Sequence, residues 1–221
     1  MKLVRLWIEG LDEILGGGLP EKSVVVMTGE PGSGYDILAQ QIMYQHALHN
    51  EKVSYFTTSR STDAIREDLS TFGWKTAPLE QQGNWAFHQI SIETAIPVLT
   101  QEIPQAVSKG HWTLIDSLSY LILTQKYLSV VKTVELLVES ARQHGGVHFV
   151  LLTQGMHDTE TETTMQHLAD GVVEFTAQET VGGIDRRMRI KKMRTAVCEP
   201  RLIPFNITDY GITIETAVRI T

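Results

Sequence analysis

Residues 24–49 read VVVMTGEPGSGYDILAQQIMYQHALH, and this stretch decides the fold. An apolar run with strand propensity comes first, a glycine-rich segment follows, and from Asp36 to His49 apolar side chains recur at helical spacing. A strand, a glycine loop and a helix in this order form the setting of a phosphate-binding loop, whose backbone N–H groups hold phosphate oxygens at the helix start. The stretch therefore predicts a βα unit of a parallel sheet.

Apolar strands and helical segments continue to alternate along the chain. Further parallel strands are predicted at 53–57, 85–88, 111–116 and 147–153, and helices at 62–72 and 129–144. After about residue 170 the sequence is rich in strands with short turns: VVEFTA (172–177), RRMRIKKM (186–193), LIPFNI (202–207) and GITIETAV (211–218). We expect an α/β fold with antiparallel strands added to a mainly parallel sheet. The 221 residues contain no evident linker, so we expect a single domain spanning 1–221.

Composition narrows the class of protein. Hydrophobic residues make up 42% of the chain and the net charge is −7, which favours a folded globule and disfavours nonspecific binding to nucleic acid. The single cysteine, Cys198, cannot form an internal disulfide. No apolar run approaches the roughly 20 residues that cross a bilayer. We therefore expect a cytoplasmic protein with no membrane association.

The glycine loop departs from a working phosphate loop at its end. In the pattern GxxxxGK[ST], the Lys neutralises the β and γ phosphates and the hydroxyl residue holds Mg²⁺. Here Tyr35 and Asp36 take those two places, and a phenol is neutral at pH 7. Asp36 would repel phosphate unless a metal bridged the two, but a carboxylate is favourable at a helix start. The backbone cradle is kept by the residues before them: Gly29, Glu30, Pro31, Gly32, Ser33 and Gly34. From the loop alone, a plain turn and a weakened nucleotide site are equally open.

Four longer stretches resemble the KaiC-like branch of the RecA/RadA ATPase superfamily. GLDEILGGGLPEKSVVVMTGEPGSG (10–34) is similar to its opening, and VSYFTTSRSTDAIREDLSTFGW (53–74) to its second strand, helix and Phe-Gly-Trp turn. HWTLIDSLS (111–119) resembles its Walker B strand, and RRMRIKKMRTAVCEPRLIPFNITDYGITI (186–214) its closing hairpins. The resemblance covers nearly the whole chain. It implies a RecA-like three-layer sandwich with helices on both faces of the sheet.

The resemblance also shows which catalytic groups this sequence lacks. The family's catalytic glutamates would fall at Ser59 and Arg60, and neither can act as a general base for water. Asp116 matches the Walker B acid that helps to hold Mg²⁺, but it also suits a capped turn at a strand end. Gln154 matches the position that senses the γ phosphate, although it also reads as a polar residue at a strand end. We therefore predict no catalytic residue and no metal site. ATP or ADP is the candidate ligand, with weakened affinity.

Residues 186–194, RRMRIKKMR, carry six basic side chains in nine positions. Alternation in a strand would place Lys192 and Arg194 on the same face as Met188 and Ile190. A solvated edge strand explains these charges. The resemblance implies instead that Lys192 and Arg194 reach the γ phosphate bound by a neighbouring subunit. The expected partner is then another copy of the chain or a different KaiC/RecA-like chain.

Two other patterns carry weaker expectations. In recombinases of this superfamily the loop after the fifth strand contacts DNA, but here that loop, GMHDTETETTMQ (155–166), is acidic and argues against nucleic acid. His46 and His49, three residues apart on one helix, are predicted to be at the surface or half-buried. Trp74 and Trp85 are predicted to fill the packing between helix and sheet.

Three functions follow from these residues. The first is a catalytically degenerate protein, a pseudo-ATPase that acts as a regulatory or assembly module. The alternative is a ring-forming protein that binds ATP or ADP without efficient hydrolysis. The third is a metal-dependent ATPase with a rearranged site, in which Asp36 and Asp116 form a metal pair.

Overall fold

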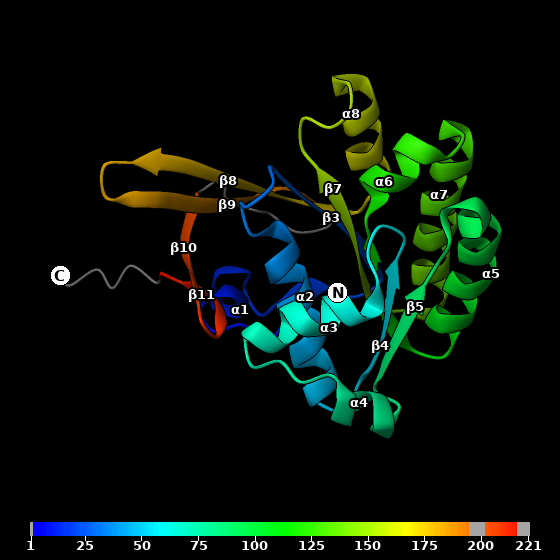
Figure 1. Ribbon diagram of the computed structural model, residues 1–221, viewed down its shortest axis with the longest axis horizontal. Helices are drawn as coiled ribbons and strands as arrows, with labels where there is room; N and C mark the ends of the chain where they lie inside the picture. The colour runs from blue at the N-terminus through cyan, green and yellow to red at the C-terminus, as the bar shows by residue number, and fades with distance from the viewer. Residues whose placement is uncertain (1, 195–201, 216–221) are drawn as a thin grey trace.

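The computed structural model describes residues 2–194 and 202–215. At its centre lies a nine-stranded sheet with the order β11-β10-β9-β8-β3-β7-β6-β4-β5 (Figure 1). Its strands are β3 (Ser23–Gly29), β4 (Lys52–Thr57), β5 (Trp85–Gln89), β6 (His111–Asp116), β7 (Val147–Thr153), β8 (Gly171–Thr180), β9 (Gly183–Met193), β10 (Ile203–Thr208) and β11 (Gly211–Ile214). A separate small sheet pairs β1 (Leu3–Val4) with β2 (Leu19–Pro20).

The sheet has the predicted division into a parallel and an antiparallel part. Strand β3 pairs in parallel with β7 and β8, and β4 pairs in parallel with β5 and β6. Strands β8 to β11 form antiparallel pairs in chain order. The expected mixed α/β sheet is confirmed, including β11 at the start of GITIETAV. The end of that segment and Cys198 lie outside the described residues.

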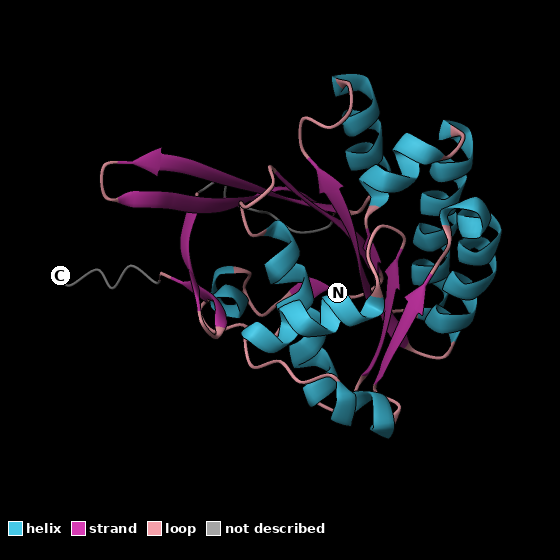
Figure 2. Cartoon of the chain, in the orientation of Figure 1, coloured by secondary structure: helices cyan, strands magenta, loops and turns pink. Residues whose placement is uncertain are grey.

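Helices cover both faces of the sheet, as Figure 2 shows. One face carries α1 (Leu11–Ile14), α2 (Tyr35–Leu48), α3 (Thr62–Thr71) and α4 (Ala77–Gln82). The other carries α5 (Ala95–Ser108), α6 (Leu118–Thr124), α7 (Tyr127–His144) and α8 (Thr159–Leu168), with the short 3₁₀ helix η1 (Ile92–Thr94) before α5. In the part of the chain that the structure describes, no helix is long and apolar enough to cross a membrane.

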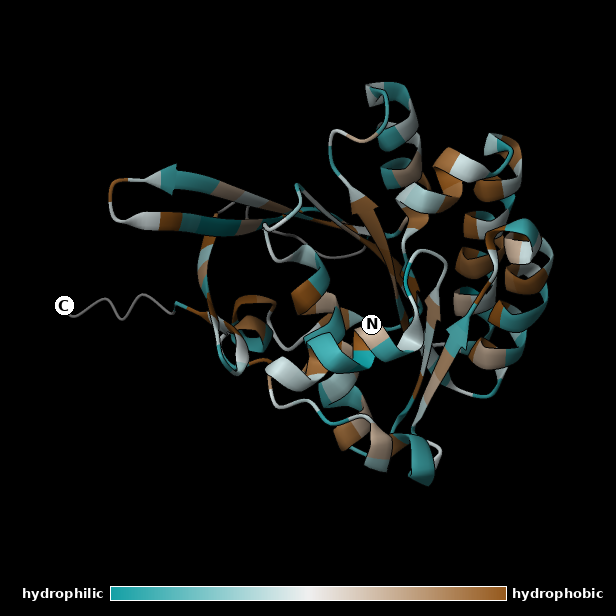
Figure 3. Ribbon diagram, viewed as in Figure 1, coloured by the Kyte–Doolittle hydropathy of each residue, from teal (hydrophilic) through white to brown (hydrophobic). Residues whose placement is uncertain are grey.

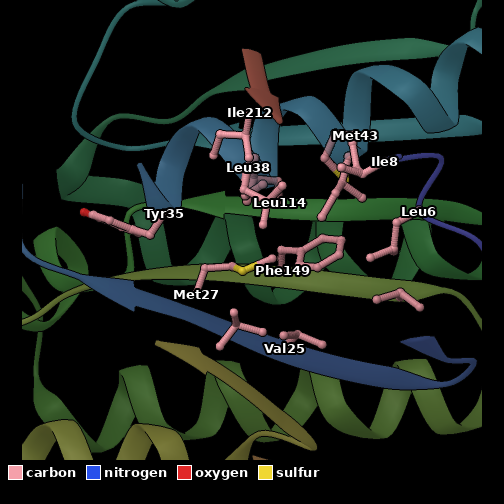
Figure 4. Close-up of a cluster of buried hydrophobic side chains, with 14 of the residues drawn as sticks. Leu6, Ile8, Val25, Met27, Tyr35, Leu38, Met43, Leu114, Phe149 and Ile212 are labelled. Atoms are coloured by element: carbon pink, nitrogen blue, oxygen red, sulfur yellow. The ribbon is translucent and has the colours of Figure 1, made fainter. Parts of the chain in front are cut away.

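Strand β3 is buried along its whole length because it contributes to both cores. Val25 and Met27 pack in the cluster beneath α2, which Figure 4 shows, whereas Val24 and Val26 pack in the cluster beneath α5 and α7. A strand that is covered on both faces reads as a continuous apolar run. The strands at the centre of the sheet are accordingly hydrophobic (Figure 3). This burial fixes the position of the glycine loop that follows β3.

The helix α5 is not among the predicted elements. Pro104 lies inside it, and a proline removes one backbone donor from the helix. The helix forms nevertheless because Leu99, Ile103 and Val107 are buried in the core that it shares with α7. Tertiary packing therefore overrides the local preference.

One prediction about β9 is wrong, because the strand contains a β-bulge. Val172 pairs with Lys192, but the next residue of β8, Val173, pairs with Ile190, so Lys191 is the extra residue. The bulge inverts the alternation beyond it. Met193 therefore joins Met188 in the core beneath α2, and Lys192 does not share their face.

The hairpin of β10 and β11 folds back over α2. The side-chain amide of Gln41 donates from Nε2 to the Ile212 carbonyl at 3.1 Å, and its Oε1 accepts from the Ile212 N–H at 2.7 Å. Gly211 has a φ of 109°, and a Cβ there would lie 2.4 Å from Cζ2 of Trp74. Any other residue would bring its Cβ into collision with the Trp74 ring, so this position requires glycine. Trp74 and Trp85 are both buried between helix and sheet, as predicted.

Candidate functional site

The glycine loop lies at the carboxyl ends of the parallel strands, between β3 and α2. Gly32 and Gly34 have φ values of 82° and 92°, in the left-handed region that favours glycine. The Ser33 N–H donates to the Glu30 carbonyl at 3.1 Å, and the Gln154 N–H after β7 donates to the Gly29 carbonyl at 2.9 Å. The loop is thus held at the start of α2, where backbone N–H groups are free of helical partners.

The underside of the loop is packed and its tip is exposed. Ser33 is fully buried, and a Cβ on Gly29 would lie only 2.3 Å from its Oγ. A Cβ on Gly34 would lie 3.1 Å from Cδ1 of Ile207 on β10. Glu30, Pro31 and Gly32 are exposed. The backbone cradle of a phosphate loop is therefore retained in form.

Tyr35 occupies the place of the loop lysine and is almost fully buried, with 8% of its surface exposed. Its hydroxyl lies 2.9 Å from Oγ1 of Thr153 at the end of β7. In Figure 4 the hydroxyl points away from the apolar cluster. Burial raises the pKa of Tyr35, so the phenol remains neutral at pH 7. The side chain therefore supplies no positive charge to the loop.

Asp116 ends β6 and is engaged by neighbouring side chains. The Tyr55 hydroxyl donates to its Oδ2 at 2.7 Å, and Nε2 of Gln40 in turn donates to the Tyr55 hydroxyl at 2.9 Å. Burial raises the pKa of Asp116, and the nearby charge of Asp36 raises it further, although the Tyr55 hydrogen bond opposes both effects. Burial also raises the pKa of Asp36. The two acids thus lie in a poorly solvated region where a second negative charge is unfavourable.

Ser59 and Arg60 follow β4 and are exposed. The Arg60 guanidinium donates to the carboxylate of Asp68 on α3, which raises the pKa of Arg60. Its positive charge favours the ionised forms of Asp36 and Asp116, and so partly opposes the rise in their pKa values that burial causes. The Arg60 guanidinium is therefore close enough to the two acids of the loop region to act on both of them.

The structure brings most of the predicted site residues to one edge of the sheet. The loop, Tyr35, Asp36, Asp116 and Gln154 all lie there, with Arg60 beside them. Among residues 2–194 and 202–215, no group of three or more His, Cys, Asp or Glu side chains is arranged to hold a metal ion. This edge has acidic and neutral side chains where a working loop places a lysine and a hydroxyl.

Lys192 and Arg194 make contacts with α8 and its neighbourhood within their own chain. The Lys192 Nζ donates to three carbonyls around the end of α8, those of Gln166, His167 and Ala169, at 3.1, 2.8 and 2.6 Å. This is a favourable place for a cation, because helix carboxyl ends carry partial negative charge. An Nη1 of Arg194 lies 3.1 Å from Oδ1 of Asp170. Their reach toward a neighbouring subunit stays a prediction.

One cation near the loop was missed by sequence reasoning. Nε of Arg186 on β9 donates to the Gly32 carbonyl at 3.4 Å. The adjacent Arg187 is instead paired with Asp185 at 2.9 Å. The sequence shows the high density of positive charge in residues 186–194. It does not show that Arg186 lies beside the loop, because that depends on where the β8–β9 hairpin lies relative to the loop.

A glycine loop lies between the central parallel strand β3 and α2, and an acid ends β6, which is separated from β3 by β7. This arrangement is that of the RecA-like class of P-loop folds. Residues 4–219 match the family model described as "ATPase: KaiC". The chain belongs to this KaiC/RecA-like P-loop ATPase family.

Known proteins that resemble this chain match it over nearly its full length. A UPF0273 protein from Pyrococcus horikoshii is 26% identical over 96% of this chain and 93% of its own length. A UPF0273 protein from Methanocaldococcus jannaschii is 27% identical over 97% of this chain and 96% of its own length. The crystal structure of a KaiC-like protein from Pyrococcus horikoshii superimposes with a TM-score of 0.83 at 22% identity, covering 97% of this chain and 99% of that one. The structural likeness confirms the predicted RecA-like fold.

Proposed function

We propose that this chain is a catalytically degenerate member of its family, which acts as a regulatory or assembly module and does not turn over ATP. The observation that carries the proposal is the hydrogen bond between Tyr35 and Thr153, with the phenol buried where a lysine would neutralise phosphate. Asp36 and Asp116 add negative charge beside it, and both have raised pKa values because they are buried. The residues present therefore do not fit Mg²⁺-bound ATP.

Phosphate release from the purified protein with ATP and Mg²⁺ tests this proposal. We expect no turnover above that of a blank, because neither Ser59 nor Arg60 can take a proton from water. The Asp116→Ala variant is the control for contamination by another ATPase. Turnover that this variant abolishes would show a working site and would contradict the proposal.

A second candidate function is favoured by Arg186. Its guanidinium lies against the loop at the Gly32 carbonyl, so it offers the loop a cation from β9 in place of the missing lysine. A guanidinium binds phosphate oxygens well, because its N–H groups form a planar fork. The chain would then hold ATP or ADP as a ligand for assembly, without hydrolysis and with weakened affinity.

Calorimetric titration with ADP tests the role of Arg186. We expect Arg186→Ala to weaken binding by about tenfold or more, as the loss of one charge-assisted hydrogen bond does. Arg187→Ala is the matched control, since Arg187 is the neighbouring cation and is paired with Asp185. Equal effects of the two substitutions would show only a general contribution of charge. If ADP gives neither a heat of binding nor a change in melting temperature with the unaltered protein, the result would favour a loop that binds no nucleotide.

The proposed regulatory or assembly role also requires a partner chain. A homo-oligomer or a hetero-oligomer with a KaiC/RecA-like chain would allow Lys192 and Arg194 to serve a neighbour's site. For that, Lys192 would have to exchange its carbonyl acceptors at α8 for a phosphate. Copurification from the native host distinguishes the two kinds of partner.

A further inference from the structure

Three neighbouring strands bring one serine and two histidines together on the α5 side of the sheet. Val53 and Tyr55 of β4 pack beneath α2, so Ser54 between them faces the opposite layer. The Oγ of Ser54 lies 2.9 Å from Nδ1 of His111 on β6 and 3.2 Å from Nε2 of His88 on β5. One hydroxyl therefore joins the three strands through side chains. None of the three residues of this His–Ser–His cluster belongs to the candidate site around the glycine loop.

The hydroxyl of Ser54 limits how many protons the cluster can accept. Ser54 is 1% exposed, so the neighbouring side chains must satisfy its hydroxyl, which has one proton to donate. With both imidazoles neutral, the hydroxyl donates to one ring and accepts the N–H of the other. If one ring takes a proton, that ring is the donor and the other is the acceptor, so both contacts survive. If both rings are protonated, both can only donate, and the hydroxyl proton has no acceptor left in the cluster.

The surroundings of the cluster also oppose protonation. Burial lowers the pKa of His88 and that of His111, so both rings are neutral at pH 7. The charges of Lys52 on β4 and Lys109 after α5 lower the pKa of His111 further, and a charged His88 has the same effect. Glu102 on α5 opposes the lowering at His88. Acid therefore produces a singly protonated cluster first, and the second proton places a like charge across a buried hydroxyl.

The cluster lies where it can hold the edge of the sheet. In the described part of the chain, β5 is an edge strand and pairs only with β4. The ring of His88 stacks on Phe56 of β4 with centroids 4.5 Å apart. In the next residue, Oε1 of Gln89 accepts from the Thr62 N–H at the start of α3, at 3.1 Å. A change at His88 therefore acts on the end of β5 and on the start of α3.

We propose that the His–Ser–His cluster is an acid-sensitive switch, in which one proton leaves β5 in place and a second proton releases its end from the sheet. Both rings have folded-state pKa values below the ordinary value of about 6.5. The stability that the cluster contributes is therefore present above that value and is lost as the pH falls below it. The switch does not depend on the function proposed for the glycine loop.

Two other histidines make the whole fold sensitive to acid. Nδ1 of His148 on β7 lies 3.0 Å from Oγ1 of Thr113, and burial lowers the pKa of His148 to about 4. His46 is 7% exposed, so the prediction of a surface or half-buried position is wrong, and burial lowers its pKa to about 3. Both residues oppose the folded state in acid. A local measurement in β5 is therefore needed to observe the switch.

Amide hydrogen exchange at pH 7.5 and pH 5, corrected for the intrinsic effect of pH on exchange, tests the proposal. We expect protection of the amides of residues 85–89 to fall at least about tenfold more than that of the central strand β3. His88→Gln and His111→Asn place an amide near the ring nitrogen that contacts Ser54, and neither new side chain can take a proton. Each variant leaves one histidine in the cluster, so each should keep β5 protected at pH 5.

His144→Gln is the matched control, since His144 is an exposed histidine of α7 outside the cluster. It should lose protection in β5 as the unaltered protein does. No local fall in the unaltered protein would overturn the proposal, as would an equal fall in His88→Gln and His111→Asn. If neither variant folds, ring NMR of the unaltered protein decides the question. Coupled titration of His88 and His111 below pH 6.5 supports the switch, and independent titration at the ordinary pKa overturns it.

Discussion

Replacing Tyr35 by Lys and Asp36 by Thr together is expected to raise the affinity for ATP with Mg²⁺ by at least about 100-fold, without starting hydrolysis. The lysine and the threonine restore the cation and the hydroxyl that a working loop uses. Each charge-assisted contact is worth about 1.5–3 kcal/mol, and two of them exceed the roughly 2.7 kcal/mol of a 100-fold change. The substitution also removes the Asp36 carboxylate from the phosphate site.

The backbone in this region is already suited to the change. Gly32 and Gly34 hold the left-handed conformations of the loop, and α2 starts directly after it. Calorimetric titration with ATP and Mg²⁺ measures the gain. Tyr35→Phe combined with Asp36→Asn is the matched control, because it removes the hydroxyl and the negative charge but adds no cation. A gain in the control equal to that in the Lys/Thr variant would show that relief of repulsion is the whole effect.

Hydrolysis should require two further changes. Ser59→Glu and Arg60→Glu, added to the Lys/Thr variant, restore the acids that could orient and deprotonate water. We expect phosphate release from the fourfold variant and none from the twofold variant. ATP turnover by the twofold variant would show that another group supplies the base.

Asp170→Ala is expected to lower the free energy of unfolding by about 3 kcal/mol, as the loss of a buried charged partner does. The Asp170 side chain is 5% exposed and lies between β3 and the residues that follow β9. Its Oδ2 accepts from the Val24 N–H at 3.1 Å, and its Oδ1 lies 3.1 Å from Arg194 and 3.6 Å from Arg142. Alanine would leave the buried Val24 N–H without its acceptor. We place the loss at the low end of the range for buried pairs, because both arginines are about half exposed and solvent screens them.

Urea unfolding followed by circular dichroism measures this loss. Asp170→Asn keeps an acceptor for Val24 but removes the charge, so it should cost about half as much. Asp185→Ala is the surface control: its pair with Arg187 is exposed to solvent and should contribute less than about 1 kcal/mol. A loss in Asp170→Ala no greater than in Asp185→Ala would contradict the role assigned to Asp170.

Some features of this site can be predicted from the sequence and others cannot. That Tyr35 is neutral and Asp36 is acidic follows from residue type, whatever the fold. The positions of Asp116 and Gln154 also follow, because Asp116 ends β6 and Gln154 directly follows β7, and the carboxyl ends of parallel strands meet at one edge of a sheet. Arg186 does not follow, since it reaches the Gly32 carbonyl across 154 residues of sequence.

The sequence by itself determined the α/β order of this protein, the glycine loop and the loss of the loop's lysine and hydroxyl. These features are local: a run of buried residues, a glycine spacing and the chemistry of single side chains. Only the tertiary structure decided which face Lys192 takes, because one extra residue in β9 inverts the strand beyond it. It alone also decided the burial of Asp170 and the contacts of His88 and His111 with Ser54. These depend on register and on contacts between distant segments, which no local pattern records.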